Sequence, residues 1–384
     1  MNSCSSAYVH IPFCVRKCPY CDFVSFEKKD EWKAPYLRAL HREIEITFEH
    51  SPGGPLATVY LGGGTPSLLK PEEAGCILDV LDASYGIEAG AEITIEVNPG
   101  TAGATTLAGY RDAGFNRLSI GVQSLSNRVL LGLGRIHTAE EAETAIDSAL
   151  QAKFENISCD LMLGIPGQTL SDIEDSVRRL IDKRVPHISC YSLSLEEGTR
   201  FFEKYSGHPE RLPSDEVERQ MYHMVRRLLI ENGYVHYEIS NFSLPGRESR
   251  HNNIYWEALP YYGFGCGAHS YIDGRRVGNT NDPEKYIHIL SCPEPDRELL
   301  VSESEWIDIE EQMREYMLLG FRKLSGISER DFHSRFGVLL EQRFKRDMTR
   351  LLELGLIQHA DDRWFLSEAG LDFGNEVFRS FVSS

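Results

Sequence analysis

The sequence predicts an α/β protein: a partial (β/α)6 barrel over residues 1–235, followed by an α-rich, winged-helix-like C-terminal domain. Two observations predict the barrel. Six short runs rich in β-branched and aromatic residues alternate with longer segments of helical periodicity, and polar or glycine residues follow the runs. The loops after parallel strands gather on one rim, so we expect the functional groups there. Beyond residue 300 the pattern is mainly helical.

The predicted barrel strands are separated by segments long enough for a crossover helix. In chain order they are Tyr8–Phe13, Thr58–Gly64, Glu92–Asn98, Arg117–Ser124, Asn156–Gly164 and His187–Glu196. Helices are predicted between them, for example at Glu31–His50, Pro71–Ser84 and Thr138–Lys153.

Residues 236–300 form a predicted extension, rich in glycine, asparagine and aromatic residues from about 241 to 280. The charges of that stretch sum to +1, in contrast to the rest of the chain; they are Arg247, Arg250, Arg275 and Arg276 against Glu248, Glu257 and Asp273. The acidic segment Cys292–Glu305 is interpreted as a connector to the tail.

The tail, residues 301–384, is predicted to hold three helices and a small hairpin. The helices are expected at Trp306–Leu324, Ser328–Phe336 and Leu339–Leu354, with Gly355 ending the third. A strand beginning at Trp364 and a last helix complete the domain.

Composition excludes several classes of protein. The 384 residues carry a formal net charge of −18, which argues against broad binding to nucleic acid or to an anionic membrane. No signal-like segment precedes the first strand, so we expect a cytoplasmic protein with reduced thiols. Six cysteines are then interpreted as scattered thiols: Cys4, Cys76, Cys159, Cys190, Cys266 and Cys292.

The other three cysteines, Cys14, Cys18 and Cys21, form a C-x3-C-x2-C array directly after the first predicted strand. Three thiolates can hold an iron–sulfur cluster but leave one of its irons without a protein ligand. Zinc ligation is an alternative, although zinc sites usually add a second Cys or His pair at regular spacing, and none follows here. Buried or redox-active thiols are the third interpretation.

Several strand ends carry groups suited to a small polar ligand. Gly62-Gly63-Gly64-Thr65-Pro66 follows the second strand, where glycines let the backbone approach a ligand closely. Carboxylates, an amide and an arginine occupy other strand ends or the loops that follow: Glu96, Gln123, Arg135 and Asp160. Taken alone, a glycine-rich segment is more often a tight turn, and each of these polar residues is more often a solvated loop residue or a structural hydrogen-bond partner. Their placement on one rim favours binding of ammonium, hydroxyl or carboxylate groups.

Taken together, these motifs resemble the radical S-adenosylmethionine (SAM) superfamily, and within it the branch of oxygen-independent coproporphyrinogen oxidase and its heme-chaperone relatives. The resemblance rests on the cysteine array, GGGTP, IEVNP, GVQS, LGRIH and DLMLGIPGQ, and it covers nearly the whole chain. It implies a [4Fe-4S] cluster on the three cysteines, whose fourth iron binds the amino and carboxylate groups of SAM.

The resemblance also implies roles for the rim residues. Those matching the first SAM site are Tyr8, Gly63, Gly64, Thr65 and Glu96, and Tyr20 in the cysteine loop is added as a cofactor-binding residue. Gln123, Arg135 and Asp160 match positions that contact a second SAM in the oxidase. Catalytic residues are not assigned by these motifs.

Two departures separate the chain from the oxidase. Phe23 stands where the oxidase has a further cysteine, and His251-Asn252-Asn253-Ile254-Tyr255-Trp256 matches the HNxxYW signature of the heme-chaperone branch. His251, Asn252, Tyr255 and Trp256 are therefore candidate heme residues. The alternative is that His251 and Tyr255 share one face of a short helix and only support the fold.

The resemblance favours a heme chaperone that carries the cluster, SAM and heme, and passes heme to an acceptor such as a respiratory hemoprotein. An electron donor, and peripheral membrane contact through the acceptor, are the other expected partners; the chain is a monomer or a dimer. The competing function is coproporphyrinogen III oxidation, in which propionates become vinyl groups. Heme degradation and a zinc-binding structural module rank below it.

Overall fold

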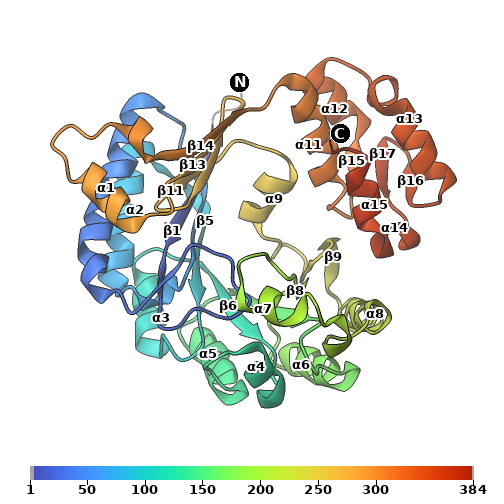
Figure 1. The fold of residues 1–384 in the computed structure, drawn as a ribbon, viewed down its shortest axis with the longest axis horizontal. Coiled ribbons are helices and arrows are strands. Elements are labelled where there is room, and N and C mark those ends of the chain that lie inside the picture. The colour runs from blue at the N-terminus through green and yellow to red at the C-terminus, as the bar shows by residue number, and fades with distance from the viewer. Residues whose placement is uncertain (1–3, 383–384) are drawn as a thin grey trace.

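The computed structural model describes residues 4–382 and is built around one curved, nine-stranded sheet (Figure 1). In spatial order its strands are β11 (Tyr262–Phe264), β1 (Ser6–Ile11), β4 (Leu56–Gly63), β5 (Ile87–Val97), β6 (Arg117–Gln123), β7 (Asn156–Leu163), β8 (His187–Ser192), β10 (Asn241–Ser243) and β9 (Val235–Glu238). Strands β11 to β8 are parallel, and β10 and β9 form an antiparallel edge. The six predicted strands and the open barrel are thus confirmed, and β11 extends the parallel part beyond β1.

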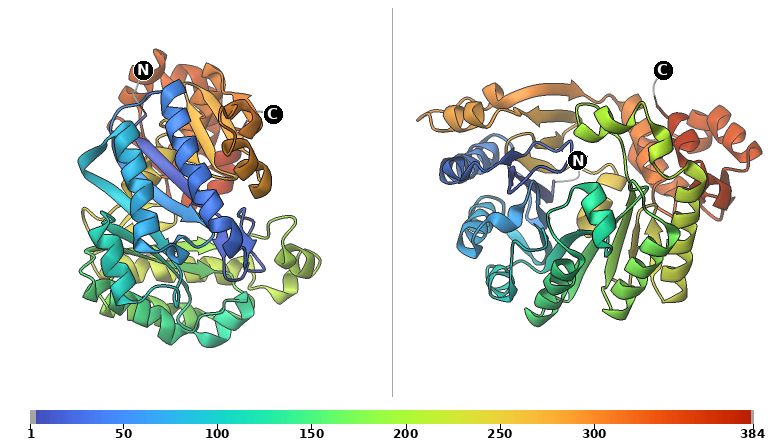
Figure 2. Two further views of the ribbon diagram at one scale, coloured as in Figure 1. Left: turned by 90° about the vertical axis from the view of Figure 1, so that its left-hand side faces the viewer. Right: turned by 60° about the horizontal axis from the view of Figure 1, so that its bottom comes forward.

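Helices cover the outer face of this sheet (Figure 2). They are α1 (Asp30–His50), α2 (Pro71–Tyr85), α3 (Ala104–Asp112), α5 (Ala139–Gln151), α6 (Leu170–Asp182) and α8 (Asp215–Glu231). The short helices α4 (Asn127–Leu133) and α7 (Arg200–Tyr205) instead share a small hydrophobic cluster with Tyr20 of the cysteine loop. In α5, Thr138 caps the N-terminus by accepting from the Glu141 N–H, and Ala142, Ile146 and Ala149 are buried. Among the helices of residues 4–382, none is long and apolar enough to cross a membrane.

The extension contains a small antiparallel sheet of β12 (His269–Ile272), β13 (Arg275–Asn279) and β14 (Val301–Trp306), with α9 (Arg250–Trp256) and α10 (Pro283–Leu290). The connector prediction for Cys292–Glu305 is wrong at its end, because β14 pairs with β13. This edge strand is solvated on most of its length, so its Ser and Glu residues look like a loop in the sequence. The next helix begins at Ile309 rather than at Trp306.

The tail has a hydrophobic core of its own, formed by residues such as Met317, Phe321, Phe332, Phe344 and Phe381. Its elements are α11 (Ile309–Gly320), β15 (Ile327–Ser328), α12 (Glu329–Phe336), α13 (Leu340–Glu353), β16 (Ile357–Ala360), β17 (Arg363–Leu366), α14 (Glu368–Asp372) and α15 (Gly374–Arg379). Helices packed on a three-stranded sheet give the winged-helix-like arrangement that the sequence predicts. Gly355, with φ +70°, follows α13 as expected.

The tail lies beside α8 and β9 at one end of the sheet (Figure 1), and polar contacts link it to α8. Arg226 on α8 donates two hydrogen bonds to the Glu368 carboxylate at 2.7 and 2.8 Å, and His223 is 2.7 Å from Asp372. Because one partner of each pair lies on the barrel, these contacts fix the orientation of the tail.

Candidate functional site

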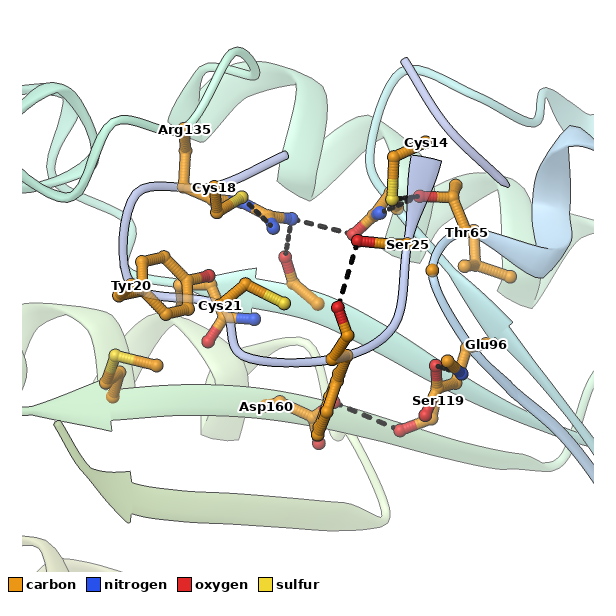
Figure 3. A pocket seen from close by; sticks show the side chains of 18 of the residues that line it. Cys14, Cys18, Tyr20, Cys21, Ser25, Thr65, Glu96, Ser119, Arg135 and Asp160 are labelled. Carbon is orange, nitrogen blue, oxygen red and sulfur yellow. Dashed lines mark hydrogen bonds between the residues drawn. The ribbon is translucent and has the colours of Figure 1, made fainter. Parts of the chain in front are cut away.

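The cysteine array lies in a loop that is closed at its base by two short strands, β2 (Phe13–Cys14) and β3 (Phe26–Glu27). Inside the loop, the Cys21 N–H donates to the Cys18 carbonyl at 3.2 Å and forms a tight turn. Figure 3 shows the three cysteine side chains over the cavity at the carboxyl end of the barrel strands. This is the rim on which the sequence predicts the functional groups.

The cysteine thiols are held by groups from neighbouring strands. The Thr65 hydroxyl contacts the Cys14 sulfur at 3.6 Å, and Arg135 Nη1 contacts the Cys18 sulfur at 3.5 Å. Burial raises the pKa of Cys14, and it raises the pKa of Cys21 to about 11. Both thiols are therefore neutral near pH 7 without a metal, and cluster ligation, which uses thiolates, must release their protons.

A single metal ion and an iron–sulfur cluster make different demands on the positions of the three thiols. Among residues 4–382, no three His, Cys, Asp or Glu side chains converge closely enough to hold one metal ion. A tetrahedral zinc needs its ligands around one point, whereas the thiolates of a [4Fe-4S] cluster each bind a different iron. Ligation of a [4Fe-4S] cluster by the three cysteines stays a prediction.

The glycine turn packs directly against the strands that lead to the cysteine loop. Gly63 has φ +108°, and its amide donates to Glu96 Oε2 at 3.1 Å. A Cβ on Gly64 would lie 2.8 Å from the Phe13 carbonyl oxygen and 2.9 Å from that of Ile11. The turn therefore needs glycine at both positions to stay this close to β1 and β2.

Replacing Gly64 by alanine is expected to destabilise the protein by about 1–3 kcal/mol, because the atoms that the new methyl group meets are backbone and cannot rotate away. The measurement is the urea midpoint of Gly64→Ala against Gly207→Ala, where a Cβ points into open space. Equal midpoints for the two variants would contradict the close packing of the turn.

Below the cysteines the barrel encloses a cavity of about 450 Å³ (Figure 3). Most of the predicted site residues line it: Cys14, Cys18, Tyr20, Cys21, Gly63, Gly64, Thr65, Glu96, Gln123, Arg135, Asp160 and Asn252. Tyr8, His251, Tyr255 and Trp256 do not. Seven separate segments of the chain are thus brought to one cavity, which a small polar molecule can fill.

Two carboxyl groups stand on the cavity wall. Glu96 accepts from the Tyr60 hydroxyl at 2.8 Å, and Asp160 accepts from the Ser119 hydroxyl at 3.1 Å. Burial raises the pKa of Glu96 to about 7, opposed by the Tyr60 hydrogen bond, and burial also raises the pKa of Asp160. Both groups can accept further hydrogen bonds from ligand ammonium or hydroxyl groups.

On the opposite side, Arg135 reaches from the loop after α4 to the cysteine array. Its Nη2 donates to Asn98 Oδ1 at 2.7 Å and to the Gly121 carbonyl at 3.0 Å. Gln123 ends β6 with φ +64°, a conformation that a non-glycine residue rarely adopts, and its side chain lines the cavity. Tyr20 packs edge-on against Phe201 with centroids 6.0 Å apart, which anchors the cysteine loop to α7.

Tyr8 lies behind the cavity rather than on its wall. Its hydroxyl bonds to His10 Nδ1 at 2.9 Å, and its ring stacks on Tyr60 at 6.2 Å. In this arrangement Tyr8 supports Tyr60, which in turn holds Glu96. Its predicted direct contact with SAM stays a prediction.

The HNxxYW segment forms α9, which is enclosed between the barrel and the tail. His251 is 1% exposed, and its ring nitrogens contact Thr58 Oγ1 at 2.8 Å and the Tyr255 hydroxyl at 2.9 Å. The backbone N–H groups of Arg250 and His251 donate to the Glu92 carboxylate. Heme ligation by His251, a role that stays a prediction, would need one of its ring nitrogens to be released.

The other candidate heme residues of α9 face different surroundings. Asn252 lines the cavity below the cysteines, and Tyr255 packs edge-on against Tyr261. The Arg322 guanidinium of the tail lies 4.3 Å from the Trp256 ring centroid, a cation–π contact. The helix therefore contacts the cavity, the barrel core and the tail at once.

Some cavity residues were missed by sequence reasoning: Tyr60, Asn98, Arg117, Ser119 and Ser158. Tyr60, Ser119 and Ser158 alternate with buried apolar residues along their strands, so the period-two pattern could have marked them as facing the barrel interior. Arg117 looks in the sequence like an ordinary solvated residue at the start of a strand.

Comparison with known proteins identifies the chain at two levels. Residues 8–180 match the radical SAM superfamily and residues 307–373 match the HemN C-terminal domain. The heme chaperone HemW of Bacillus subtilis is 36% identical over 98% of this chain and 99% of its own length. That of Lactococcus lactis is 34% identical over 98% and 97%, and that of Escherichia coli is 34% identical over 98% of each chain.

A solved structure shares the whole fold. Coproporphyrinogen III oxidase (HemN) of Escherichia coli, described as a radical SAM enzyme, superposes with a TM-score of 0.85, covering 99% of this chain and 90% of the oxidase at 21% identity. At this identity the likeness establishes the fold alone. Together with the near full-length relatives, these matches show that the chain belongs to the HemW family of the radical SAM superfamily.

Proposed function

We propose that the protein is a heme chaperone, which binds heme and transfers it to an acceptor hemoprotein. The observation that carries this proposal is the sequence similarity, over nearly the full length of the chain, to relatives named heme chaperone. An intact HNxxYW segment in α9 supports it. Phe23 in place of the further cysteine supports the same choice over the oxidase. The acceptor is a hemoprotein such as a respiratory enzyme, reached in the cytoplasm or at the membrane surface.

Within this proposal the barrel, residues 1–235, holds a [4Fe-4S] cluster and SAM. Cys14, Cys18 and Cys21 would bind the cluster. When bound, the cluster would supply one-electron chemistry at the iron that has no protein ligand. Glu96 and Asp160 accept hydrogen bonds from the ligand, and Arg135 keeps a positive charge beside Cys18. An electron donor is the partner that the cluster requires.

The extension, residues 236–300, would contribute the heme contacts, and the tail, residues 301–384, would hold α9 in place. His251 offers a neutral imidazole, because burial lowers its pKa to about 3. Neutral imidazole is the form that binds heme iron. Tyr255 and Trp256 add flat apolar faces against which a macrocycle can pack.

Titration of the anaerobically reconstituted protein with heme tests this function. We expect a Soret change that saturates at one heme per chain, and transfer of that heme to an apo-hemoprotein in a second step. A protein that gives no saturable change would contradict the proposal.

The competing oxidase function is tested on the same preparation. Coproporphyrinogen III, SAM and a reductant are added without oxygen, and the products are analysed by mass spectrometry. We expect no vinyl product above the Cys21→Ala background, because Phe23 departs from the oxidase pattern. Vinyl formation that depends on Cys21 would instead establish the oxidase.

A further inference from the structure

A buried arginine on the cavity wall has no hydrogen-bond or ion-pair partner among the residues that the structure describes. Arg117, the first residue of β6, is 2% exposed and lines the cavity. Its side chain donates no hydrogen bond and forms no ion pair within residues 4–382, and its buried Nε has no acceptor. An isolated charge removed from water costs several kcal/mol, so buried arginines are normally paired.

The acidic neighbours of Arg117 are engaged elsewhere. Glu96 accepts from Tyr60 and the Gly63 amide, and Asp160 accepts from Ser119 and Ser158. Arg117 acts on both carboxyl groups only through its charge, which opposes the rise in pKa that burial causes. The guanidinium thus lines the cavity with hydrogen-bond donors that no described residue uses.

A second unpaired donor lines the same cavity from α9. The side-chain amide of Asn252 forms no hydrogen bond with the described residues, although its backbone N–H donates to Ser249. The planar guanidinium fork and a primary amide are donors that match the two oxygens of a carboxylate. A doubly charged phosphate fits less well, because Glu96 and Asp160 share this wall and would repel it more strongly.

We propose that Arg117 and Asn252 form a carboxylate-binding subsite on the wall of the barrel cavity, which holds the acid group of the molecule bound there. Two proposed ligands of this protein carry such a group. One is SAM, whose carboxylate would bind the open iron through one oxygen and leave the other oxygen for the subsite. The other is a tetrapyrrole with its propionates. The tetrapyrrole source rests on the heme-chaperone function proposed above, whereas the SAM source rests on family membership alone.

Two matched ligand pairs distinguish the sources. SAM is compared with decarboxylated SAM, and heme with heme dimethyl ester, each titrated into the cluster-loaded wild type, Arg117→Met and Arg117→Lys. For the pair that uses the subsite, we expect Arg117→Met to weaken the free acid about 10- to 100-fold, as for loss of a charge-assisted hydrogen bond. The carboxyl-free analogue should bind the wild type and Arg117→Met with equal affinity. Arg117→Lys should recover part of the affinity for the free acid that Arg117→Met loses.

Thermal unfolding without ligand separates a binding role from a structural one. Because Arg117 has no partner, Arg117→Met should unfold at the same or a higher temperature than the wild type. Arg111→Met is the control, since Arg111 donates to the Ala152 carbonyl outside this cavity. If Arg117→Met unfolds many degrees below the wild type, Arg117 stabilises the fold as the counterion of Glu96 and Asp160. That result would overturn the proposal.

The binding data can overturn it as well. An unchanged affinity for both free acids, or an equal loss for acid and carboxyl-free analogue, shows that Arg117 does not bind a carboxylate. If heme fails to bind the wild type, the heme-chaperone function fails, and the SAM pair alone decides on the subsite.

Discussion

Replacing Cys21 by alanine is expected to abolish the iron–sulfur cluster. The three cysteines of the array line the cavity and are the predicted cluster ligands. Without Cys21 the cluster would have two protein ligands and two exposed irons, so we expect it not to be retained. After anaerobic reconstitution the wild type should contain about four irons and four sulfides per chain and be brown. The Cys21→Ala protein should be colourless, with iron near background.

The control for this experiment is Cys76→Ala, which removes an exposed cysteine on α2, outside the array. It should reconstitute like the wild type. SAM binding should fall with the cluster in the Cys21→Ala protein, because the open iron provides part of the binding site. A wild type that takes up one zinc per chain and no iron would contradict the cluster and support the structural zinc module.

The barrel could be predicted because its signals are local. Each strand is a short apolar run followed by a helix with its own cap, such as Thr138 before α5, so the order of elements implies parallel pairing. The edge strand β14 could not be predicted, since Glu303 and Glu305 face solvent and the strand with which it pairs, β13, lies more than twenty residues earlier. Such pairing leaves no mark on the composition of the strand.

The site residues likewise divide into those that the sequence could predict and those that it could not. Cys14, Glu96 and Asp160 belong to recognisable motifs at strand ends, and all three line one cavity. Arg117 was missed because its importance comes from the absence of a partner, which only the folded arrangement of β5, β6 and α9 reveals. The burial of His251 could not be predicted either, because it depends on Thr58, which is remote in sequence.

The hydrogen bonds of His251 define which nitrogen is available to iron. Thr58 Oγ1 donates to Ser6 Oγ at 2.9 Å, so it accepts from His251 and the proton lies on Nδ1. The lone pair therefore lies on Nε2, where it accepts from the Tyr255 hydroxyl at 2.9 Å. The ring also stacks on Tyr60 with centroids 5.1 Å apart. In this state Tyr255 covers the nitrogen that a heme iron would need.

Heme binding is accordingly expected to respond in opposite directions to two neighbouring substitutions. His251→Ala removes the ligand and should abolish the saturable Soret change. Tyr255→Phe removes the hydroxyl that covers Nε2 but keeps an aromatic ring, so it should bind heme at least as tightly as the wild type, and faster. Both are measured by stopped-flow titration, with the thermal midpoint of each variant recorded beside it.

The thermal midpoints decide between ligation and support. Both substitutions break the hydrogen bond between His251 and Tyr255, which contributes about 1–2 kcal/mol, so Tyr255→Phe should lower the midpoint by a few degrees. His251→Ala also loses the Thr58 hydrogen bond and the stacking on Tyr60, so its midpoint should fall further. If His251 acts only by holding α9 in place, Tyr255→Phe must lose heme in proportion to its loss of stability, as His251→Ala does. Retention of heme by Tyr255→Phe at a lowered midpoint, together with its loss in a His251→Ala protein that is still folded at the titration temperature, supports direct contact between the imidazole and the heme.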